Sequence, residues 1–444
     1  MNHALLSRFT QSEKVEAIPH AQPGNALVPR LRAGELLWVM GSKFCLMGAN
    51  AALMVFLVNR LELTTYGLLV ITISGQLLIS RLLMMGVDAG IIRLGGLHEP
   101  DVHSQQVVAA GLLIMLLSSS GLLLVFLGVS PALSRSHVPV WISTSIVAGA
   151  IGTSLVDYGY SFRLASQQYR LAALAQGGTA ICRLAITVAA ALLWPAQPLI
   201  IFAAYHGTSL LSGVLQLVIV AGKSGLRSPK TVVGRLFRYS FWQAKANVLV
   251  ILSLYQGTFL LMILRQQAAT GIFGLGLTIS IGFFAVYNAY FEYLLAHTAT
   301  IETDDALSHF LRRAFIGAFG LSVACGPVIL LLAKAMPWVL RPELLEVIPI
   351  FYYLAASMVL LILQAPLEVM CHCLLRPQVV SFGWLARAAL IAVVGIFLAS
   401  RMGAIGAAMA QLIGSLLTLM MLAGAVLLIA RFARPISPVR LAAH

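Results

Sequence analysis

The chain has 444 residues, of which 60% are hydrophobic and only 10% are charged. Because soluble domains are about a quarter charged, this composition excludes a soluble globular enzyme, a disordered chain and a fibre. A membrane-spanning helix takes roughly 20 residues, so the apolar residues suffice for about a dozen spans.

Apolar runs separated by polar residues predict an all-α polytopic membrane protein. Helices are required because lipid cannot hydrogen-bond the exposed backbone groups of an open strand. The runs are also longer than the strands of a membrane barrel. In chain order the twelve predicted helices are Leu36–Val58, Tyr66–Ile91, Gln106–Leu127, Val138–Tyr160, Leu171–Trp194, Leu199–Ala221, Tyr239–Leu264, Gly271–Leu295, Phe310–Leu332, Val347–Cys371, Val380–Ser400 and Ala404–Ile429.

A basic stretch at residues 223–238 divides these helices into two sets of six. We expect an N-terminal six-helix bundle at 34–222 and a C-terminal one at 239–431, joined by this cytoplasmic linker, with cytoplasmic tails at 1–33 and 432–444. Similar residues recur in both halves at a nearly constant separation: Lys43 and Lys245, Arg60 and Arg265, Gly67 and Gly274, Asp88 and Glu292, Arg183 and Arg387. Since each half has an even number of spans, the two bundles are parallel repeats around a central cavity.

The Lys and Arg residues outside the predicted spans lie mostly on the side of the membrane that holds both termini. This bias is the positive-inside pattern, which places both termini in the cytoplasm and is typical of a multi-pass protein of the bacterial inner membrane. The topology therefore explains the net charge of +14, and we expect no nucleic-acid partner.

Charged residues inside the apolar runs are the candidate functional groups, because such residues normally face a water-filled cavity or a partner. Arg60 and Arg265 follow the first and seventh spans and are expected at the outer rim of the cavity. Several basic groups in a low dielectric favour an anion, and Arg suits phosphate in particular. The bases expected deeper in the cavity are Lys43, Arg81, Arg183, Lys245 and Arg387.

Four acidic residues, Asp88, Asp157, Glu292 and Glu368, are candidates for ion coupling or for charge pairing. Arg81 and Asp88 are two turns apart and share one face of a continuous helix. Two interpretations stay open for these groups. They line a transport path, or they neutralise one another as buried structural pairs.

The sequence indicates no catalytic or metal site. The five cysteines have no spacing typical of a disulfide framework or a zinc site, and His206, alone in its span, is expected to be hydrogen-bonded rather than catalytic. Gly222-Lys223-Ser224 is similar to the end of a nucleotide-binding loop, but Leu217 stands where the first glycine is required. We expect no enzyme and no cofactor, and transport driven by an H+ or Na+ gradient, the membrane potential or the gradient of the substrate.

Residues 61–67 (LELTTYG), followed by Ser74-Gly75-Gln76 and by residues 86–93 (GVDAGIIR), resemble the first hairpin of oligosaccharide flippases. These are the Wzx-like O-antigen and exopolysaccharide translocases of the multidrug/oligosaccharidyl-lipid/polysaccharide exporter superfamily. The length, the twelve spans and the two-half plan are similar over essentially the whole chain after residue 33.

The resemblance implies a V-shaped, alternating-access transporter of the bacterial inner membrane. Such a protein moves an undecaprenyl-pyrophosphate-linked oligosaccharide from the cytoplasmic to the periplasmic leaflet during O-antigen, capsule or exopolysaccharide assembly. Its partners would be this lipid-linked substrate, membrane lipid, a polysaccharide polymerase and a chain-length regulator. The basic cavity residues would hold the pyrophosphate and glycan.

Three alternatives remain. A multidrug exporter of the same superfamily captures cations, so acids should dominate its cavity. A lipid II flippase carries the same pyrophosphate, but that family usually has two additional spans. A non-transporting scaffold of a glycan-assembly complex would need no charge in a cavity.

Overall fold

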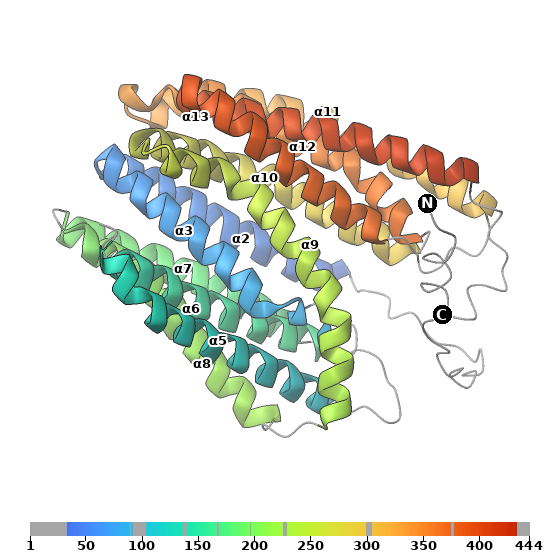
Figure 1. The fold of residues 1–444 in the computed structure, drawn as a ribbon, viewed down its shortest axis with the longest axis horizontal. Coiled ribbons are helices and arrows are strands. Elements are labelled where there is room, and N and C mark those ends of the chain that lie inside the picture. The colour runs from blue at the N-terminus through green and yellow to red at the C-terminus, as the bar shows by residue number, and fades with distance from the viewer. Residues whose placement is uncertain are drawn as a thin grey trace.

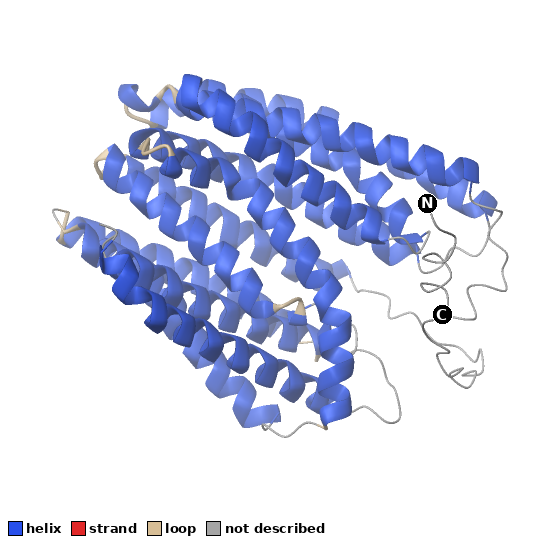
Figure 2. Ribbon diagram, in the orientation of Figure 1, coloured by secondary structure: helices blue, strands red, loops and turns tan. Residues whose placement is uncertain are grey.

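The structure is a computed structural model that describes residues 33–88, 90–91, 104–135, 140–166, 168–195, 197–224, 229–298, 304–373 and 377–432. Helices make up nearly all of these residues, and no strand occurs among them (Figure 2). The chain is a multi-pass membrane protein, because eleven of its described helices are long and apolar enough to cross a membrane.

The helices lie close to the predicted positions. Their bounds are α2 Ala33–Val58, α3 Leu63–Met84, α5 Ser104–Arg135, α6 Val140–Ala165, α7 Tyr169–Leu193, α8 Pro198–Ser224, α9 Lys230–Ile263, α10 Gln267–Thr298, α11 Asp304–Val339, the short 3-10 helix η1 Pro342–Leu344, α12 Val347–Cys373 and α13 Pro377–Phe432. This arrangement confirms the all-α polytopic fold.

Helix α13 is a helical hairpin rather than one long rod. Its helical geometry is broken at Gly403, whose φ of 59° and ψ of −134° lie in a region that glycine adopts readily. The two arms pack antiparallel, since a Cβ on Gly414 would meet Ile391 and one on Gly383 would meet Leu422. The hairpin therefore accounts for the two predicted spans on either side of residues 401–403.

Helix α3 ends earlier than predicted. The expected helix ran from Tyr66 to Ile91, but α3 stops at Met84, and Met85 (φ 45°) and Gly86 (φ 69°) both adopt left-handed conformations. These two residues interrupt α3, as a left-handed residue at a helix end commonly does, and residues 87–88 and 90–91 are helical again. Asp88 consequently does not lie on a continuous helix with Arg81, so the prediction of one helix over Tyr66–Ile91 is wrong, although the two side chains still contact each other.

The helices run roughly along the long axis of the molecule, so their connections lie at two opposite ends (Figure 1). Helix α2 begins and α13 ends at one of them. The opposite end, which we call the turn end, holds the short connections 59–62, 264–266 and 340–346 and the α13 break at Gly403. An even number of crossings explains why the described chain starts and finishes at the same end.

Helix α9 crosses from one half of the molecule to the other (Figure 1). It begins at Lys230, so residues 230–238 of the expected linker are helical. Near its start, Val232 and Leu236 are buried in a cluster with residues of α5, whereas Leu254 and Leu261 further along belong to the cluster that contains much of α10 and α12. The first part of α9 thus packs on the N-terminal half and the rest on the C-terminal half.

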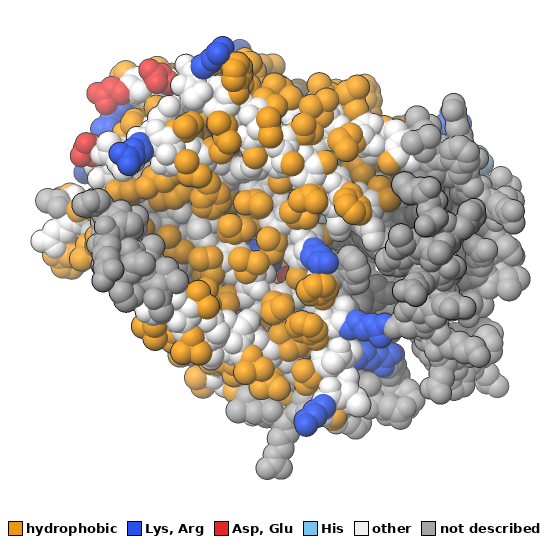
Figure 3. Space-filling model, viewed as in Figure 1, with side chains coloured by type: hydrophobic (Ala, Val, Ile, Leu, Met, Phe, Trp, Pro, Cys, Tyr) orange, Lys and Arg blue, Asp and Glu red, His pale blue; other side chains and the backbone are white. Residues whose placement is uncertain are grey.

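The two halves meet at the crossing of α3 and α10. A Cβ on Gly67 of α3 would collide with the carbonyl oxygen of Gln267, and a Cβ on Gly274 of α10 would meet Val70 of α3. Gly67 and Gly274 are the pair matched between the halves in the sequence, so each half contributes an equivalent small residue to this contact. Hydrophobic side chains cover much of the middle of the face shown in Figure 3, as a lipid-facing surface requires.

Candidate functional site

A pocket of about 200 Å³ lies between helices α2, α3, α6, α7 and α8 of the N-terminal half and is completed by α9 and α10. Its charged lining residues are Arg81, Asp157 and Arg183, and its polar ones include Asn50, Ser209 and Tyr205. The remaining lining is largely aliphatic. A mostly apolar wall with a few convergent polar groups is the usual form of a small-ligand site.

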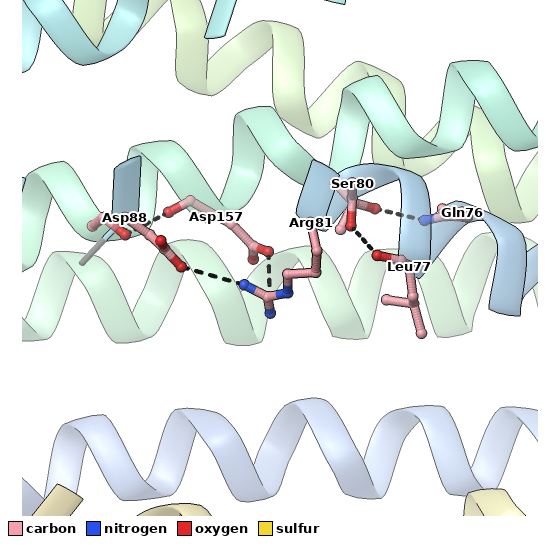
Figure 4. A network of polar contacts seen from close by, with 8 residues as sticks. Gln76, Leu77, Ser80, Arg81, Asp88 and Asp157 are labelled. Atoms are coloured by element: carbon pink, nitrogen blue, oxygen red, sulfur yellow. Dashed lines mark hydrogen bonds and ion pairs between the residues drawn. The ribbon is translucent and has the colours of Figure 1, made fainter. Parts of the chain in front are cut away.

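Arg81 forms the first charged centre of the pocket (Figure 4). Its Nη1 lies 3.4 Å from Asp88 Oδ2, and its Nη2 lies 3.7 Å from Asp157 Oδ2. The three side chains are 32%, 20% and 22% exposed, respectively. Asp88 follows the left-handed residues Met85 and Gly86 and lies beyond Arg81 along the chain, and Asp157 belongs to α6 (Figure 4).

Arg183 forms the second charged centre, on α7. This buried guanidinium donates from Nη2 to Asn50 Oδ1 at 2.7 Å and from Nη1 to Ser209 Oγ at 3.4 Å, and it lies 4.9 Å from the centre of the Tyr205 ring. Its Nε has no hydrogen-bond partner among the described residues. Both of these hydrogen-bond acceptors are neutral, in contrast to the carboxylates that contact Arg81.

His206 supports the wall of the pocket. Its Nδ1 lies 2.6 Å from Gln76 Oε1 and its Nε2 lies 3.1 Å from Thr72 Oγ1, while Gln76 Nε2 donates to Thr153 Oγ1 at 2.5 Å. The prediction of a hydrogen-bonded histidine is confirmed. These contacts tie α8, α3 and α6 together, so the lining residues Thr153 and Asp157 are presented from a fixed wall.

Arg387, the counterpart of Arg183 in the second half, is fully buried away from this pocket. Its Nη2 donates to Ser357 Oγ and to Gln411 Oε1, both at 3.4 Å, and its guanidinium lies 5.0 Å from the Trp384 ring. Arg387 reaches the last arm of α13, as Arg183 reaches α8, which is consistent with a repeated plan. The repeat places the two arginines in separate halves, so they do not form one binding cluster.

Glu368 is a buried carboxylate in the second half, 1% exposed. It accepts hydrogen bonds from the Tyr287 hydroxyl at 2.7 Å and from Gln364 Nε2. It does not line the pocket. Its carboxylate is instead hydrogen-bonded by neighbouring side chains of the C-terminal half. The side chain of Glu292, in α10, lies outside the described residues.

The two candidate lysines are placed differently from the arginines. Lys43 is half-buried on the face of α2 that also carries the lining residues Leu46 and Asn50, about one and two turns further along. Lys245 is exposed near the start of the apolar part of α9, with Nζ 4.5 Å from the centre of the Phe241 ring. Neither lines the pocket, so their expected role in substrate binding stays a prediction.

Arg60 and Arg265 are exposed residues of the turn end, one after α2 and one after α9. Their matched positions agree with the repeated plan, and the guanidinium of Arg60 lies 5.8 Å from the centre of the Phe56 ring. They do not line the pocket. Their predicted place at the outer rim of the cavity and their contact with substrate therefore stay predictions.

Arg341 holds the two halves together at the turn end, a role that sequence reasoning missed. Its Nη2 donates to the carbonyl oxygens of Val58 at 2.8 Å and Leu61 at 3.4 Å, and its backbone N–H donates to Asn59 Oδ1 at 3.2 Å. Asn59 Nδ2 in turn donates to the Val339 carbonyl at 3.1 Å. This set, which we call the Arg341 latch, joins the α2–α3 turn to the end of α11.

Several neutral lining residues were also absent from the sequence prediction, among them Ser209, Tyr205 and Tyr255. These residues carry no charge, so the search for charged residues inside apolar runs did not select them. Asn50 carried the one usable signal, a polar residue two turns from Lys43 on an apolar helix. No group of three or more His, Cys, Asp or Glu side chains able to hold a metal ion occurs in the described part of the chain.

The arrangement of helices is similar to that of several solved transporters. The inward-facing conformation of a multidrug resistance MATE family transporter of the MOP superfamily has a TM-score of 0.65 at 11% sequence identity, covering 90% of this chain and 100% of that one. The lipid II flippase MurJ, in an inward closed conformation, has a TM-score of 0.58 at 11% identity, covering 92% and 90%.

A third similar structure is a MOP superfamily transporter from Pyrococcus furiosus, for which reverse polarity of the binding pocket suggests a different function. Its TM-score is 0.55 at 12% identity, covering 89% of this chain and 94% of that one. No protein-family model and no curated protein sequence matches the chain. At these identities the similarity establishes the fold alone, which is that of MOP superfamily transporters.

Proposed function

We propose that this protein is a flippase that moves a polyprenyl-pyrophosphate-linked oligosaccharide across the bacterial inner membrane by alternating access. The proposal assigns the pyrophosphate to the pocket between α2, α3, α6, α7 and α8. It assigns no enzymatic step, and both termini would lie in the cytoplasm. The direction would be from the cytoplasmic to the periplasmic leaflet, as in O-antigen, capsule or exopolysaccharide assembly.

The observation that carries the proposal is the pair Arg81 and Arg183 in one pocket. Each guanidinium presents planar N–H groups that match phosphate oxygens and remains charged at any physiological pH. Arg183 has an unpartnered buried Nε, and Tyr205 and Tyr255 add hydroxyl-bearing rings to the same lining. The pocket therefore holds two cationic side chains, of which Arg81 also contacts Asp88 and Asp157.

The geometry at the turn end supports alternating access. The Arg341 latch and the α3–α10 crossing at Gly67 hold the two halves together there. Since both contacts join the N-terminal half to the C-terminal half, opening this end requires breaking them. A headgroup would then enter from the opposite end, which the charge bias of the sequence places in the cytoplasm.

The membrane potential favours movement of such an anionic substrate out of the cytoplasm. A potential that is negative inside favours outward movement of an anion by about 2.3 kcal/mol per charge per 100 mV. A pyrophosphate diester carries two negative charges, so no nucleotide site is needed to drive its export. An H+ or Na+ gradient and a steep substrate gradient are the further sources that we retain.

Two other substrates fit the same fold. A cation exporter is supported by the multidrug resistance neighbour and by Asp157 in the pocket. A lipid II flippase is supported by the MurJ neighbour and would use the same two arginines. The substrate assignment rests on Arg183, which is hydrogen-bonded to neutral side chains, whereas Asp157 and Asp88 are both engaged with Arg81.

Ligand binding by the purified protein in lipid nanodiscs tests the proposal. The probes are a short-chain prenyl-pyrophosphoryl sugar, the same lipid with a single phosphate, and the cationic dye ethidium. We expect the diphosphate to bind most tightly, and Arg81→Gln and Arg183→Gln to weaken it. Tight ethidium binding that survives both substitutions, without binding of the diphosphate, would contradict the proposal and favour the cation exporter.

A cellular measurement separates glycan classes. Deletion of the gene should abolish surface O-antigen, capsule or exopolysaccharide while cells remain viable, and a polymerase and a chain-length regulator would then be the expected partners. Loss of viability with arrested peptidoglycan synthesis would favour a lipid II flippase instead.

A further inference from the structure

The two halves of the molecule contribute different side-chain chemistry to the pocket. Its charged lining residues in the described part of the chain, Arg81, Asp157 and Arg183, all belong to helices of the N-terminal half. The described lining residues of α9 and α10 carry no charge, and we call them the neutral wall. They are Tyr255, Leu277, Thr278 and Ile281.

The neutral wall offers two hydroxyl groups on an apolar background. The Thr278 hydroxyl donates its hydrogen to the Gly274 carbonyl oxygen at 2.8 Å, so its oxygen lone pairs are left to accept from a ligand. The Tyr255 hydroxyl can donate and accept. Tyr255 lies on the part of α9 that packs on the C-terminal half, and its electrostatic interaction with Arg81 places the neutral wall beside the charged centres.

Neutral hydrogen-bonding groups also lie on α7, on the other side of the pocket. The Thr179 hydroxyl donates to the Ala175 carbonyl oxygen at 2.8 Å, which again leaves an acceptor. Gln176 accepts from Ser42 through Oε1 at 3.3 Å, so its amide N–H groups are the part that can serve a ligand. A ligand that satisfies these groups needs O–H or N–H donors as well as acceptors. An ionised phosphate and a hydrocarbon chain supply no donors.

The size of the pocket limits how much of a ligand it encloses. Its volume of about 200 Å³ is below the roughly 300–1,000 Å³ of sites that enclose a drug-sized ligand. It therefore takes one small polar group next to the phosphates. A sugar ring has the required hydroxyl donors and acceptors, and its C–H groups can pack against Leu277 and Ile281.

We infer that the C-terminal half binds the sugar that follows the pyrophosphate, through Tyr255 and Thr278, while Arg183 of the N-terminal half binds a phosphate. A sugar-bearing lipid then contacts both halves of the transporter. A prenyl pyrophosphate without a sugar keeps the contact with Arg183 and lacks the contacts with the neutral wall. This inference rests on the proposed function, because it concerns the pocket assigned to the pyrophosphate.

The experiment compares two probes for binding to the protein in nanodiscs, a short-chain prenyl-pyrophosphoryl sugar and the same prenyl pyrophosphate without the sugar. The variants are Tyr255→Phe and Thr278→Val, which each remove one hydroxyl and keep the shape of the side chain. Thr418→Val is the matched control. Thr418 is buried in α13, and its hydroxyl donates to the Gly414 carbonyl oxygen at 2.7 Å, as Thr278 does to Gly274, but it does not line the pocket.

We expect the wild type to bind the sugar-bearing lipid more tightly than the lipid without a sugar. Tyr255→Phe and Thr278→Val should each weaken binding of the sugar-bearing lipid by about 2- to 12-fold, the effect of one lost hydrogen bond. Binding of the lipid without a sugar should be unchanged in both. Arg183→Gln, by contrast, should weaken both lipids, and Thr418→Val should weaken neither. Thermal unfolding of each variant checks its folding.

Two results overturn the inference and leave the proposed function standing. Equal losses for both lipids in Tyr255→Phe and Thr278→Val would show that the neutral wall acts on the phosphates or on the shape of the pocket. Equal affinity of the wild type for the two lipids, weakened by Arg183→Gln, would show that the sugar makes no contact there. If the wild type binds neither lipid, the proposed function fails and this inference fails with it.

Discussion

Replacing Arg183 by Gln tests which buried arginine serves the ligand. Arg183 and Arg387 occupy matched positions in the two halves, and each is buried and hydrogen-bonded to neutral side chains. Arg183 lines the pocket and Arg387 does not. Arg387→Gln is therefore a control that carries the same loss of a buried charge without a change in the proposed site.

The size of the expected effect follows from the bonds that Arg183 would make to the headgroup. A hydrogen bond to a charged group contributes about 1.5–3 kcal/mol, and Arg183 offers its unpartnered Nε and its positive charge to one phosphate. Since about 1.4 kcal/mol corresponds to a factor of ten, Arg183→Gln should weaken binding of the prenyl-pyrophosphoryl sugar by about 10- to 150-fold. Arg183→Lys keeps the charge but not the planar group, so its affinity should lie between those of the wild type and Arg183→Gln.

The assay is equilibrium binding in nanodiscs, with thermal unfolding of each variant as the check on folding. Arg387→Gln should bind within about twofold of the wild type even where its melting temperature falls. Equal losses of affinity for Arg183→Gln and Arg387→Gln would refute the reasoning, because a general effect of removing a buried charge would then explain both. Unchanged affinity in Arg183→Gln would refute it directly.

The contacts between the halves give two further predictions. Gly67→Ala places a methyl group against the Gln267 carbonyl and should destabilise the protein by about 1–3 kcal/mol. The control is Gly178→Ala, which should not lower the melting temperature because nothing lies within 4 Å of the added methyl group. Equal melting temperatures of the two variants would contradict the tight α3–α10 crossing. Arg341→Ala removes the hydrogen bonds to Val58 and Leu61 and should open the turn end. A Thr278→Cys reporter in the pocket should then react faster with a membrane-impermeant maleimide added on the side of the turn end. The control is the same reporter with Arg341 intact. Unchanged labelling would show that the Arg341 latch does not control access.

Much of the fold followed from the sequence because a lipid environment leaves few alternatives. Apolar runs of this length have to be helices, and even the break at Gly403 fell between two predicted spans. The end of α3 was missed, since the apolar run continues past Met84 and only Gly86 marks the break in the helix. The start of α9 was missed because its first two turns are basic and amphipathic, and hydropathy alone reads such a segment as a loop.

The candidate site was predicted in part. The sequence singled out Arg81, Asp157 and Arg183, since charges inside apolar runs are costly and rare. It also grouped Lys245 and Arg387 with them, because a linear sequence shows burial and sign but not which half of the molecule a side chain faces. The contact between Arg81 and Asp157 joins two helices, α3 and α6, and no spacing rule contains it.

Transport by the reconstituted protein tests the central claim most directly. Proteoliposomes containing a fluorescent prenyl-pyrophosphoryl oligosaccharide would be given a membrane potential, and movement between leaflets followed by quenching from outside. We expect movement with the wild type and Arg387→Gln, and little with Arg81→Gln or Arg183→Gln. Equal movement with all four proteins would contradict a pyrophosphate held by Arg81 and Arg183. Transport of ethidium by proteins that do not move the oligosaccharide lipid would contradict it as well.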